Sequence, residues 1–488
     1  MTFSSLVFLC IFLPGTFLLH SAIPNLRVRN ALLIVASLLF YAYGEPVYIL
    51  LLLASVLLNY LAVLLMTGRR KKLMLVLAIL LNLCILITFK YLGFLISSVN
   101  ELLGTNLAVP GIRLPIGISF FTFQALSYVI DVYRGEAERE RNPFRVLLYI
   151  SFFPQLIAGP IVRFRDIAAQ LRSREVRIDR AALGFRRFLF GLSKKVLIAN
   201  TMAVVVDSIF EADLVNVNLL TAWIGAIAFL LQIYFDFSGY SDMAIGMGQM
   251  FGFRFRENFD FPYAATSIKE FWRRWHISLS TWFREYVYIP LGGNRKGKLR
   301  TALNKLMVFF LCGLWHGARW TYVLWGLFHG AFSFLEEFVP KLRKLPRVLG
   351  HLYAMLVVTI GFVIFRADTV GEAFGMIGRM FGGYDFSTAT MSFVLQQLTP
   401  FFLVMLVAGI LLAGPAEGLV KRIRFGTGAA DFGMNPNGKS GLSEGGEKTV
   451  GGSVILQSVL YLAAFLLLLW CLLRLSGGAY NPFIYFRF

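Results

Sequence analysis

The sequence contains five histidines, and their surroundings along the chain differ. His20 and His351 lie near the ends of apolar runs, and His329 lies within one, which is typical of interfacial or packed side chains. His316 ends a strongly apolar run, in the string LWHGA at 314–318. An ionisable group at such a depth is costly unless it faces the interior of a helix bundle or a water-filled cavity. This position predicts that His316 belongs to a functional site.

His276, in the string FWRRWHISLS at 271–280, is the second candidate. Two tryptophans and two arginines precede it, a composition that also suits a helix at a membrane interface. Neutral imidazole has a pKa of about 6.5 and acts as a general base near neutral pH without a large shift. We therefore predict that His276 and His316 form a pair, in which one imidazole accepts a proton and the other orients a ligand.

Cys312 precedes His316 by four residues and would share its face of a helix, where a thiol offers a nucleophile. A buried free cysteine more often serves as a small apolar residue, and we interpret Cys312 in this way. The other cysteines, Cys10, Cys84 and Cys471, also lie in apolar stretches without metal-ligand spacing. We expect neither a disulfide framework nor a bound metal.

Two strings near the C-terminus match known motifs literally. GMNPNGKS at 433–440 fits the phosphate-binding pattern GxxxxGK[ST], and GLSEG at 441–445 fits the hydrolase pattern GxSxG. Both patterns work only where a buried strand leads into a helix. The flanking sequence is rich in glycine and has no apolar strand. We interpret 425–452 as a flexible Gly-rich cytoplasmic loop in which both matches arise by chance.

The elements that must position the histidines are membrane helices. Of the 488 residues, 57% are hydrophobic and 15% charged, whereas soluble domains carry about 25% charged residues. Apolar runs long enough to span a bilayer recur along the chain and predict eleven to thirteen spans in an all-α polytopic membrane protein. Gly246 and Gly248 within one run indicate close helix packing. The predicted spans are 3–23, 31–43, 46–66, 73–95, 115–132, 188–210, 218–236, 302–315, 320–336, 348–366, 391–414 and 453–473, with 145–161 short and re-entrant.

The net charge of +20, from 47 Lys and Arg against 27 Asp and Glu, reports orientation. Basic residues gather between apolar runs, as at 69–72, 134–141 and 341–347, while alternate connections carry few of them. The positive-inside rule places these clusters in the cytoplasm and the N-terminus outside the cell membrane. We therefore expect the basic face to contact membrane lipids and not nucleic acid.

Two basic segments, 160–187 and 253–300, are too polar to cross lipid. Either they lie in the interface as amphipathic helices on anionic lipid, or they line a polar funnel that docks an anionic cytosolic ligand. In the second interpretation, Arg273, Arg274 and Arg284 are candidates for contacting the phosphates of that ligand.

A series of strings in order resembles the membrane-bound O-acyltransferases, in the branch that contains the membrane subunit of alginate O-acetyltransferase. The resemblance runs from the first span to the last residue. Its strings are LPIGISFFTFQALSYVIDVYR at 114–134, FPQLIAGPI at 153–161, YFDFSGYSDMAIG at 234–246, FWRRWHISLS at 271–280, LWHGA at 314–318 and NPFIYFRF at 481–488.

The resemblance implies a single domain over 1–488 in which membrane, re-entrant and interfacial helices surround a central funnel or tunnel. It implies O-acyl transfer, with the essential histidine of the family at His316 and a second functional residue at His276. Further candidate substrate-binding residues in these motifs are Trp275, Trp315, Asp236 and Gln155.

On this basis we expect a membrane O-acetyltransferase in which His316 is the catalytic base. The donor would be cytosolic acetyl-CoA, as a co-substrate and not a bound cofactor. The acceptor would be hydroxyls of an extracytoplasmic polysaccharide, or a partner acetyltransferase that completes the transfer. An alternative within the class is transfer of D-alanyl or another acyl group from a carrier protein to teichoic acid. A transporter is less favoured, because no convincing internal repeat is present, and a scaffold would give His316 no role.

Overall fold

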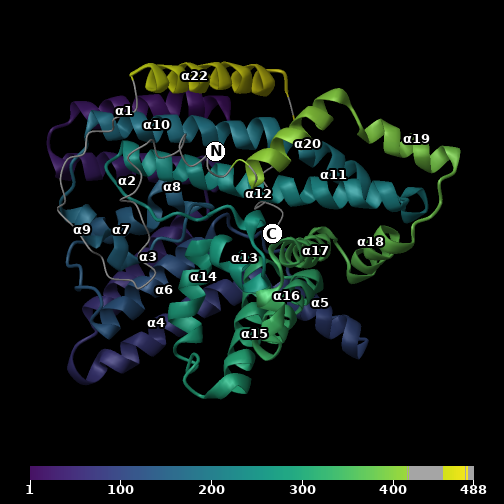
Figure 1. Cartoon of the computed structure of the whole chain (residues 1–488). Helices are drawn as coiled ribbons and strands as arrows, with labels where there is room; N and C mark the ends of the chain where they lie inside the picture. Colours follow the sequence, from purple (N-terminus) through teal and green to yellow (C-terminus); the bar gives the residue numbers. More distant parts are fainter. Residues whose placement is uncertain (415, 417–453, 479, 482–488) are drawn as a thin grey trace.

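The computed structural model of the chain describes residues 1–414, 416, 454–478, 480 and 481 (Figure 1). Within this part of the chain every regular element is a helix, as the composition predicts. The 425–452 segment, with both motif matches, lies outside the described residues.

The helices follow one another with mostly short connections, and η marks short 3₁₀ or π-helical segments. The first elements are η1 (Phe8–Phe12), α1 (Leu13–Ala22), α2 (Leu26–Gly44), α3 (Ile49–Leu64), η2 (Gly68–Arg70), α4 (Lys71–Leu86), η3 (Ile87–Tyr91), α5 (Leu92–Leu103), α6 (Ile118–Arg134), α7 (Pro143–Ser151), α8 (Phe153–Leu156) and α9 (Phe164–Arg172). The next are α10 (Ile178–Ser193), η4 (Lys194–Ala199), α11 (Asn200–Phe210), η5 (Leu214–Asn216), α12 (Leu219–Met250), η6 (Pro262–Ala264), α13 (Ile268–Arg274), α14 (Ile277–Phe283), η7 (Arg284–Tyr288) and α15 (Gly297–His316). The last are α16 (Trp320–Phe338), η8 (Pro340–Lys344), α17 (Arg347–Arg366), α18 (Val370–Gly382), α19 (Thr388–Gln397), α20 (Pro400–Ala413) and α22 (Val454–Ser476).

Within the described residues, six helical runs are long and apolar enough to cross a membrane, or seven if α19 and α20, bent by 67°, form one span. The sequence predicts eleven to thirteen spans. The counts differ because some apolar windows hold shorter helices, such as Phe8–Ala22 and Ile49–Leu64. The six runs are Leu26–Gly44, Gly68–Leu103, Ile178–Phe210, Leu219–Met250, Arg347–Arg366 and Gln457–Ser476.

The most extensive helix packing joins α10 to α12, which run side by side through the molecule (Figure 1). A methyl group on Gly246 would lie 2.5 Å from Gly184 O, and one on Gly191 would lie 2.6 Å from Gly239 O. Small residues at such contacts let two backbones approach within van der Waals distance. The close packing predicted for Gly246 is therefore confirmed.

Buried ion pairs also join these two helices. The π-helical turn η4 directs two successive lysines toward α12, where Lys195 Nζ lies 2.8 Å from Asp236 Oδ1 and Lys194 Nζ lies 2.7 Å from Asp242 Oδ2. Arg187 binds the other oxygen of Asp242 at 2.8 Å and Glu257 at 2.6 Å. Charges inside a membrane domain are tolerated when they are paired in this way.

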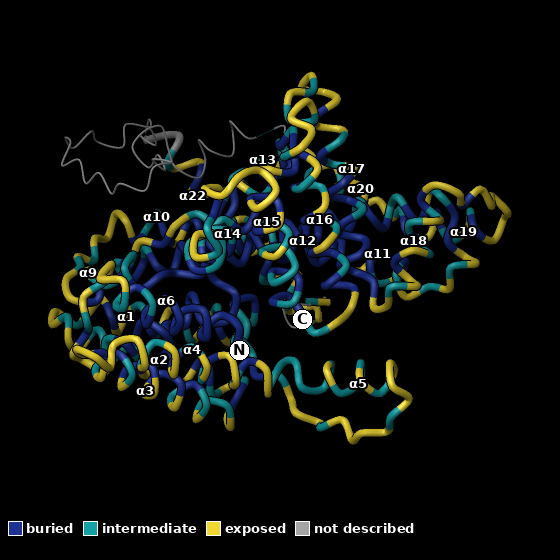
Figure 2. The backbone as a smooth tube through the Cα atoms, turned by 90° about the horizontal axis from the view of Figure 1, so that it is seen from below, coloured by how far each residue is buried: buried dark blue, intermediate teal, exposed yellow. Residues whose placement is uncertain are grey.

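The segments that break the apolar pattern fold inward. The 145–161 window forms two short buried helices, α7 and α8, that meet at Phe152. The basic 253–300 segment includes α13, α14 and η7, and several of their apolar side chains, such as Ile268, Phe271 and Phe283, are buried. These helices are therefore packed into the folded body. In Figure 2, by contrast, α5 and its following loop project from the body; α5 has no buried residue, and most of the loop is exposed.

Candidate active site

His316 is the last residue of α15, and the chain after it turns away in an extended conformation at Gly317. A methyl group at Gly317 would collide with the ring of Tyr322, so the glycine lets α16 pack against the end of α15. The His316 side chain is 7% exposed. Its ring centroid lies 5.0 Å from Trp315, 5.1 Å from Trp325 and 5.3 Å from Phe365, which fixes the imidazole among aromatic rings.

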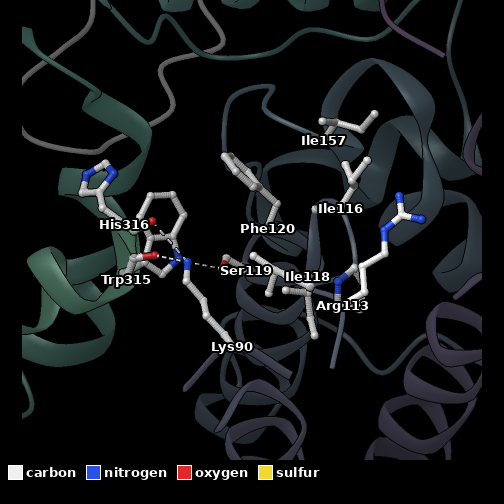
Figure 3. Close-up of a pocket in the computed structure, with 12 residues that line it drawn as sticks. Lys90, Arg113, Ile116, Ile118, Ser119, Phe120, Ile157, Trp315 and His316 are labelled. Atoms are coloured by element: carbon white, nitrogen blue, oxygen red, sulfur yellow. Dashed lines mark hydrogen bonds between the residues drawn. The ribbon is translucent and has the colours of Figure 1, made fainter. Parts of the chain in front are cut away.

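A cavity of about 430 Å³, the His316 pocket, lies beside this histidine (Figure 3). One wall is the end of α15, and the other is the loop that leads into α6. Arg113 stands on the second wall, where its guanidinium lies 3.4 Å from Glu45 Oε1. The pocket combines apolar walls with two cations and an imidazole. Its lining residues are Lys90, Arg113, Leu114, Pro115, Ile116, Gly117, Ile118, Ser119, Phe120, Ile157, Trp315 and His316.

Lys90, from the π-helical turn η3, connects the two walls. Its Nζ donates hydrogen bonds to Trp315 O at 2.5 Å, to His316 O at 3.4 Å and to Ser119 Oγ at 3.1 Å. Figure 3 shows the Lys90 side chain between Ser119 on one wall and the backbone of Trp315 and His316 on the other. Lys90 was not among the predicted site residues, although a lysine inside the apolar 73–95 run points to a functional site in the same way as His316 does.

His276 is fully buried between α13 and α14 and has a left-handed backbone, with φ 44°. Its Nδ1 lies 3.1 Å from Asn258 Oδ1, which also accepts from Ser278 Oγ at 2.8 Å. Because the Asn258 amide donates to Ser241 Oγ, the oxygen faces His276, and Nδ1 carries the proton in this network. Nε2 is then the basic nitrogen, and it has no hydrogen-bond partner among the described residues.

The two histidines belong to one buried cluster with Trp315. The Trp315 ring centroid lies 6.0 Å from that of His276 and 5.0 Å from that of His316. The sequence predicted that His276 and His316 form a pair. The structure places both around one indole, at the junction of α14 and α15.

A second cavity of about 580 Å³, the Arg273 pocket, is lined by α13, α14 and an earlier part of α15. Arg273, whose side chain is 75% exposed, stands at this pocket with two other cations. Cys312 lines it too, so this thiol and His316 line different cavities although they are one turn apart. The lining residues are Thr266, Ser267, Lys269, Glu270, Trp272, Arg273, Leu279, Ser280, Phe283, Val308, Phe309, Cys312 and Arg343.

Glu270 is the acidic residue in the lining of the Arg273 pocket. Burial opposes ionisation of its carboxyl, but hydrogen bonds from the backbone and hydroxyl of Thr266 and from Arg274 outweigh burial and lower its pKa. Glu270 is therefore ionised at neutral pH. Three cations against one anion leave the lining with a positive charge.

The remaining predicted residues take other positions. Arg274 binds Glu270 Oε1 at 3.0 Å, and Arg284 lies 3.2 Å from Glu285 Oε1. Trp275 is buried against Phe259, with ring centroids 5.0 Å apart. None of these three lines the His316 pocket or the Arg273 pocket.

Asp236 and Gln155 are buried in the helix bundle. Asp236 forms the ion pair with Lys195 described above. The Gln155 amide donates to Tyr149 O. In the described residues they support packing beside the site and do not line its two pockets.

Ionisable side chains buried among apolar helices indicate a functional site in a membrane protein, and the comparison with known proteins shows the class. The family model of the membrane-bound O-acyltransferases matches residues 39–367. The chain belongs to this family and is a membrane-bound O-acyltransferase, which confirms the resemblance found in the sequence.

Individual relatives extend the match. The probable alginate O-acetylase AlgI of Azotobacter vinelandii is 40% identical over the full length of both chains. The peptidoglycan O-acetyltransferase of Helicobacter pylori is 36% identical, over 78% of this chain and 80% of its own. The teichoic acid D-alanyltransferase of Bacillus subtilis is 29% identical, over 51% of this chain and 67% of its own.

Proposed function

We propose that the protein moves an acetyl group from cytosolic acetyl-CoA to a hydroxyl of an extracytoplasmic polysaccharide, or to a partner acetyltransferase that passes it on. The proposal rests on the position of the last turns of α15. Cys312 lines the cationic Arg273 pocket, and His316, one turn further on, lines the His316 pocket. A donor and an acceptor that approach from opposite sides would meet at this turn.

Charge supports this orientation. Arg343, in the lining of the Arg273 pocket, belongs to the basic cluster at 341–347. Arg113, in the lining of the His316 pocket, belongs to the 104–117 connection, which lies between the basic clusters at 69–72 and 134–141 and is poor in Lys and Arg. The positive-inside rule then opens the Arg273 pocket toward the cytoplasm and the His316 pocket toward the outside, and places the N-terminus outside.

The chemistry of each pocket suits its substrate. Phosphates of acetyl-CoA are attracted by Lys269, Arg273 and Arg343, because cations in a cleft raise the local concentration of anions. The lining also includes apolar side chains, such as Trp272 and Phe309, that suit the uncharged arm that carries the thioester.

The reaction needs a base at the acceptor hydroxyl. His316 removes the hydroxyl proton while the oxygen attacks the thioester carbonyl, the C–O bond forms and the C–S bond breaks. The thiolate that leaves takes the proton back from the His316 imidazolium, so that free coenzyme A and an ester are the products. His276 lines neither pocket and would act through Trp315, whose ring centroid lies 6.0 Å from its own and which lines the His316 pocket.

The test is acetyl transfer by the purified protein in nanodiscs, with radiolabelled acetyl-CoA and soluble oligosaccharide acceptors. Wild type labels an acceptor, and His316→Ala lowers the rate about 10²–10⁴-fold, the usual effect of removing a general base. His351→Ala is the matched control, because His351 is exposed on α17 and lines neither pocket in the described chain. Wild-type turnover by His316→Ala would refute the assignment.

The same preparation separates acetyl transfer from the alternative. A carrier protein charged with D-alanine is offered in place of acetyl-CoA, with lipoteichoic acid as the acceptor. We expect no transfer from this donor. Transfer from the charged carrier without transfer from acetyl-CoA would replace the proposed donor and acceptor with those of the D-alanyl reaction.

A further inference from the structure

The end of α15 is held by two successive residues of another helix. A helix leaves its last carbonyls without intrahelical partners. In α15 these are Leu314 O, Trp315 O and His316 O. Tyr91 Oη donates to the first at 2.7 Å, and Lys90 Nζ donates to the second at 2.5 Å and the third at 3.4 Å. We call Lys90 and Tyr91 the α15 clamp.

The π-helical turn η3 explains how neighbouring residues reach one target. An inserted residue in an α-helix widens the turn locally and re-aims its side chains, and such turns are frequent at functional sites. Here η3 spans Ile87–Tyr91, between α4 and α5, and the clamp residues are its last two. A cation at a helix C-terminus is also favoured by the helix dipole.

The clamp fixes the distance between the two walls of the His316 pocket. The third hydrogen bond of Lys90 goes to Ser119 Oγ, in the first turn of α6. Gly117, which precedes this turn, has φ 79°, and a methyl group there would lie 2.8 Å from Leu156 O, so this wall is itself tightly packed. The ammonium thus connects a rigid wall to the turn that carries His316.

The body of α15 does not need the clamp. It packs against α16 through Gly313 and Gly326, whose missing side chains leave room for Tyr322 O and Phe309 O. Within α15, the hydrogen bonds of Lys90 and Tyr91 go to carbonyls of the last turn. Removal of the clamp would therefore release the position of the imidazole and leave the helix in place.

We propose that Lys90, assisted by Tyr91, is a positioning residue that holds His316 at its pocket for proton transfer. This inference rests on the proposed role of His316 as the base. A displacement of about 1 Å at a catalytic group costs about 10²-fold in rate, and loss of the clamp permits a displacement of this size.

The experiment compares Lys90→Met, which keeps length and removes the charge, with Tyr91→Phe, which removes one donor. The matched control is Lys305→Met, because Lys305 lies on α15, pairs with Glu337 at 2.6 Å and lines neither the His316 pocket nor the Arg273 pocket. We expect kcat to fall about 10²-fold in Lys90→Met and about tenfold or less in Tyr91→Phe. The KM for acetyl-CoA should stay within about threefold of wild type, and Lys90→Arg should recover part of the loss.

A second readout needs no substrate. Diethylpyrocarbonate modifies neutral imidazole, and mass spectrometry of the His316 peptide gives the rate. Lys90→Met should raise that rate several-fold as the last turn frays, while Lys305→Met should leave it unchanged.

The two readouts separate the two claims. If Lys90→Met changes neither the modification rate of His316 nor kcat, the proposal that the clamp holds the last turn of α15 is wrong. A changed modification rate with wild-type kcat shows that the clamp orders the turn without serving catalysis, and overturns its positioning role. If wild type transfers no acetyl group, the proposed function fails, while the modification rate still decides whether the clamp holds His316.

Discussion

His276 keeps a backbone conformation that non-glycine residues avoid. Its φ of 44° and ψ of 54° fall in the left-handed region, which costs a side-chain-bearing residue about 1–3 kcal/mol. Asn258 offsets this cost, because its Oδ1 contacts His276 Nδ1 and accepts from Ser278 N and Oγ. The amide therefore fixes both the turn and the tautomer, with Nε2 left basic.

Asn258→Ala should lower kcat about 10–100-fold, as loss of an orienting partner of a functional histidine does. Asn82→Ala is the control, since Asn82 is an equally buried amide that pairs with Asn59 at 2.7 Å, away from the histidines. It should lower stability without lowering kcat per folded enzyme. Equal kcat in the two variants would mean that orientation of His276 is unimportant.

His316 could be predicted from the sequence, whereas the role of Lys90 could not. Both are ionisable residues in apolar runs, so both carry the same signal. Lys90, however, acts on a carbonyl 225 residues further along the chain. Nothing in the local sequence indicates such a partner, and its role emerges only once α15 and η3 are placed side by side.

At the scale of elements, glycines decide which helices touch. The close packing predicted at Gly246 is a contact of α12 with α10, where Gly184 lies opposite. The sequence could not show which helix supplies that partner. Nor could it show that 253–300 folds inward, because buried aromatic residues and exposed arginines alternate there as they would on an interfacial helix.

Gly246→Ala should destabilise the protein, since the added methyl group meets Gly184 O at 2.5 Å and two backbones must separate. Gly378→Ala, in α18, has nothing within 4 Å of the added methyl group. It should be neutral or stabilising by up to about 1 kcal/mol, because alanine favours a helix. Thermal unfolding in detergent, followed by tryptophan fluorescence, measures both. A Tm for Gly246→Ala equal to that of wild type would show that the interface yields easily.

At the scale of the molecule, the basic residues behind the net charge of +20 are unevenly distributed. Composition predicted a basic face, and the structure adds a cavity whose lining includes Lys269, Arg273 and Arg343. The sequence pointed to Arg273, Arg274 and Arg284 alike. Arg273 lines this cavity, where its guanidinium lies 3.8 Å from Glu270 Oε1, whereas Arg274 and Arg284 lie outside the lining, a distinction that requires the fold.

Arg273→Ala should raise the KM for acetyl-CoA about tenfold and leave kcat close to wild type, because one charge-assisted contact to phosphate is lost. The effect should shrink at high salt, where such contacts are screened. Arg300→Ala removes the same charge from an exposed position on α15 outside the pocket lining and should leave KM unchanged. Matching KM values for the two variants would place the donor phosphates elsewhere.

The ion pairs between η4 and α12 have a consequence for how the protein enters the membrane. Alone, the helical run Ile178–Phe210 would carry Arg187, Lys194 and Lys195 into lipid, and α12 would carry Asp236 and Asp242. Each isolated helix is a poor substrate for insertion, whereas the pair is nearly neutral. We therefore expect the two helices to enter the bilayer together as a hairpin.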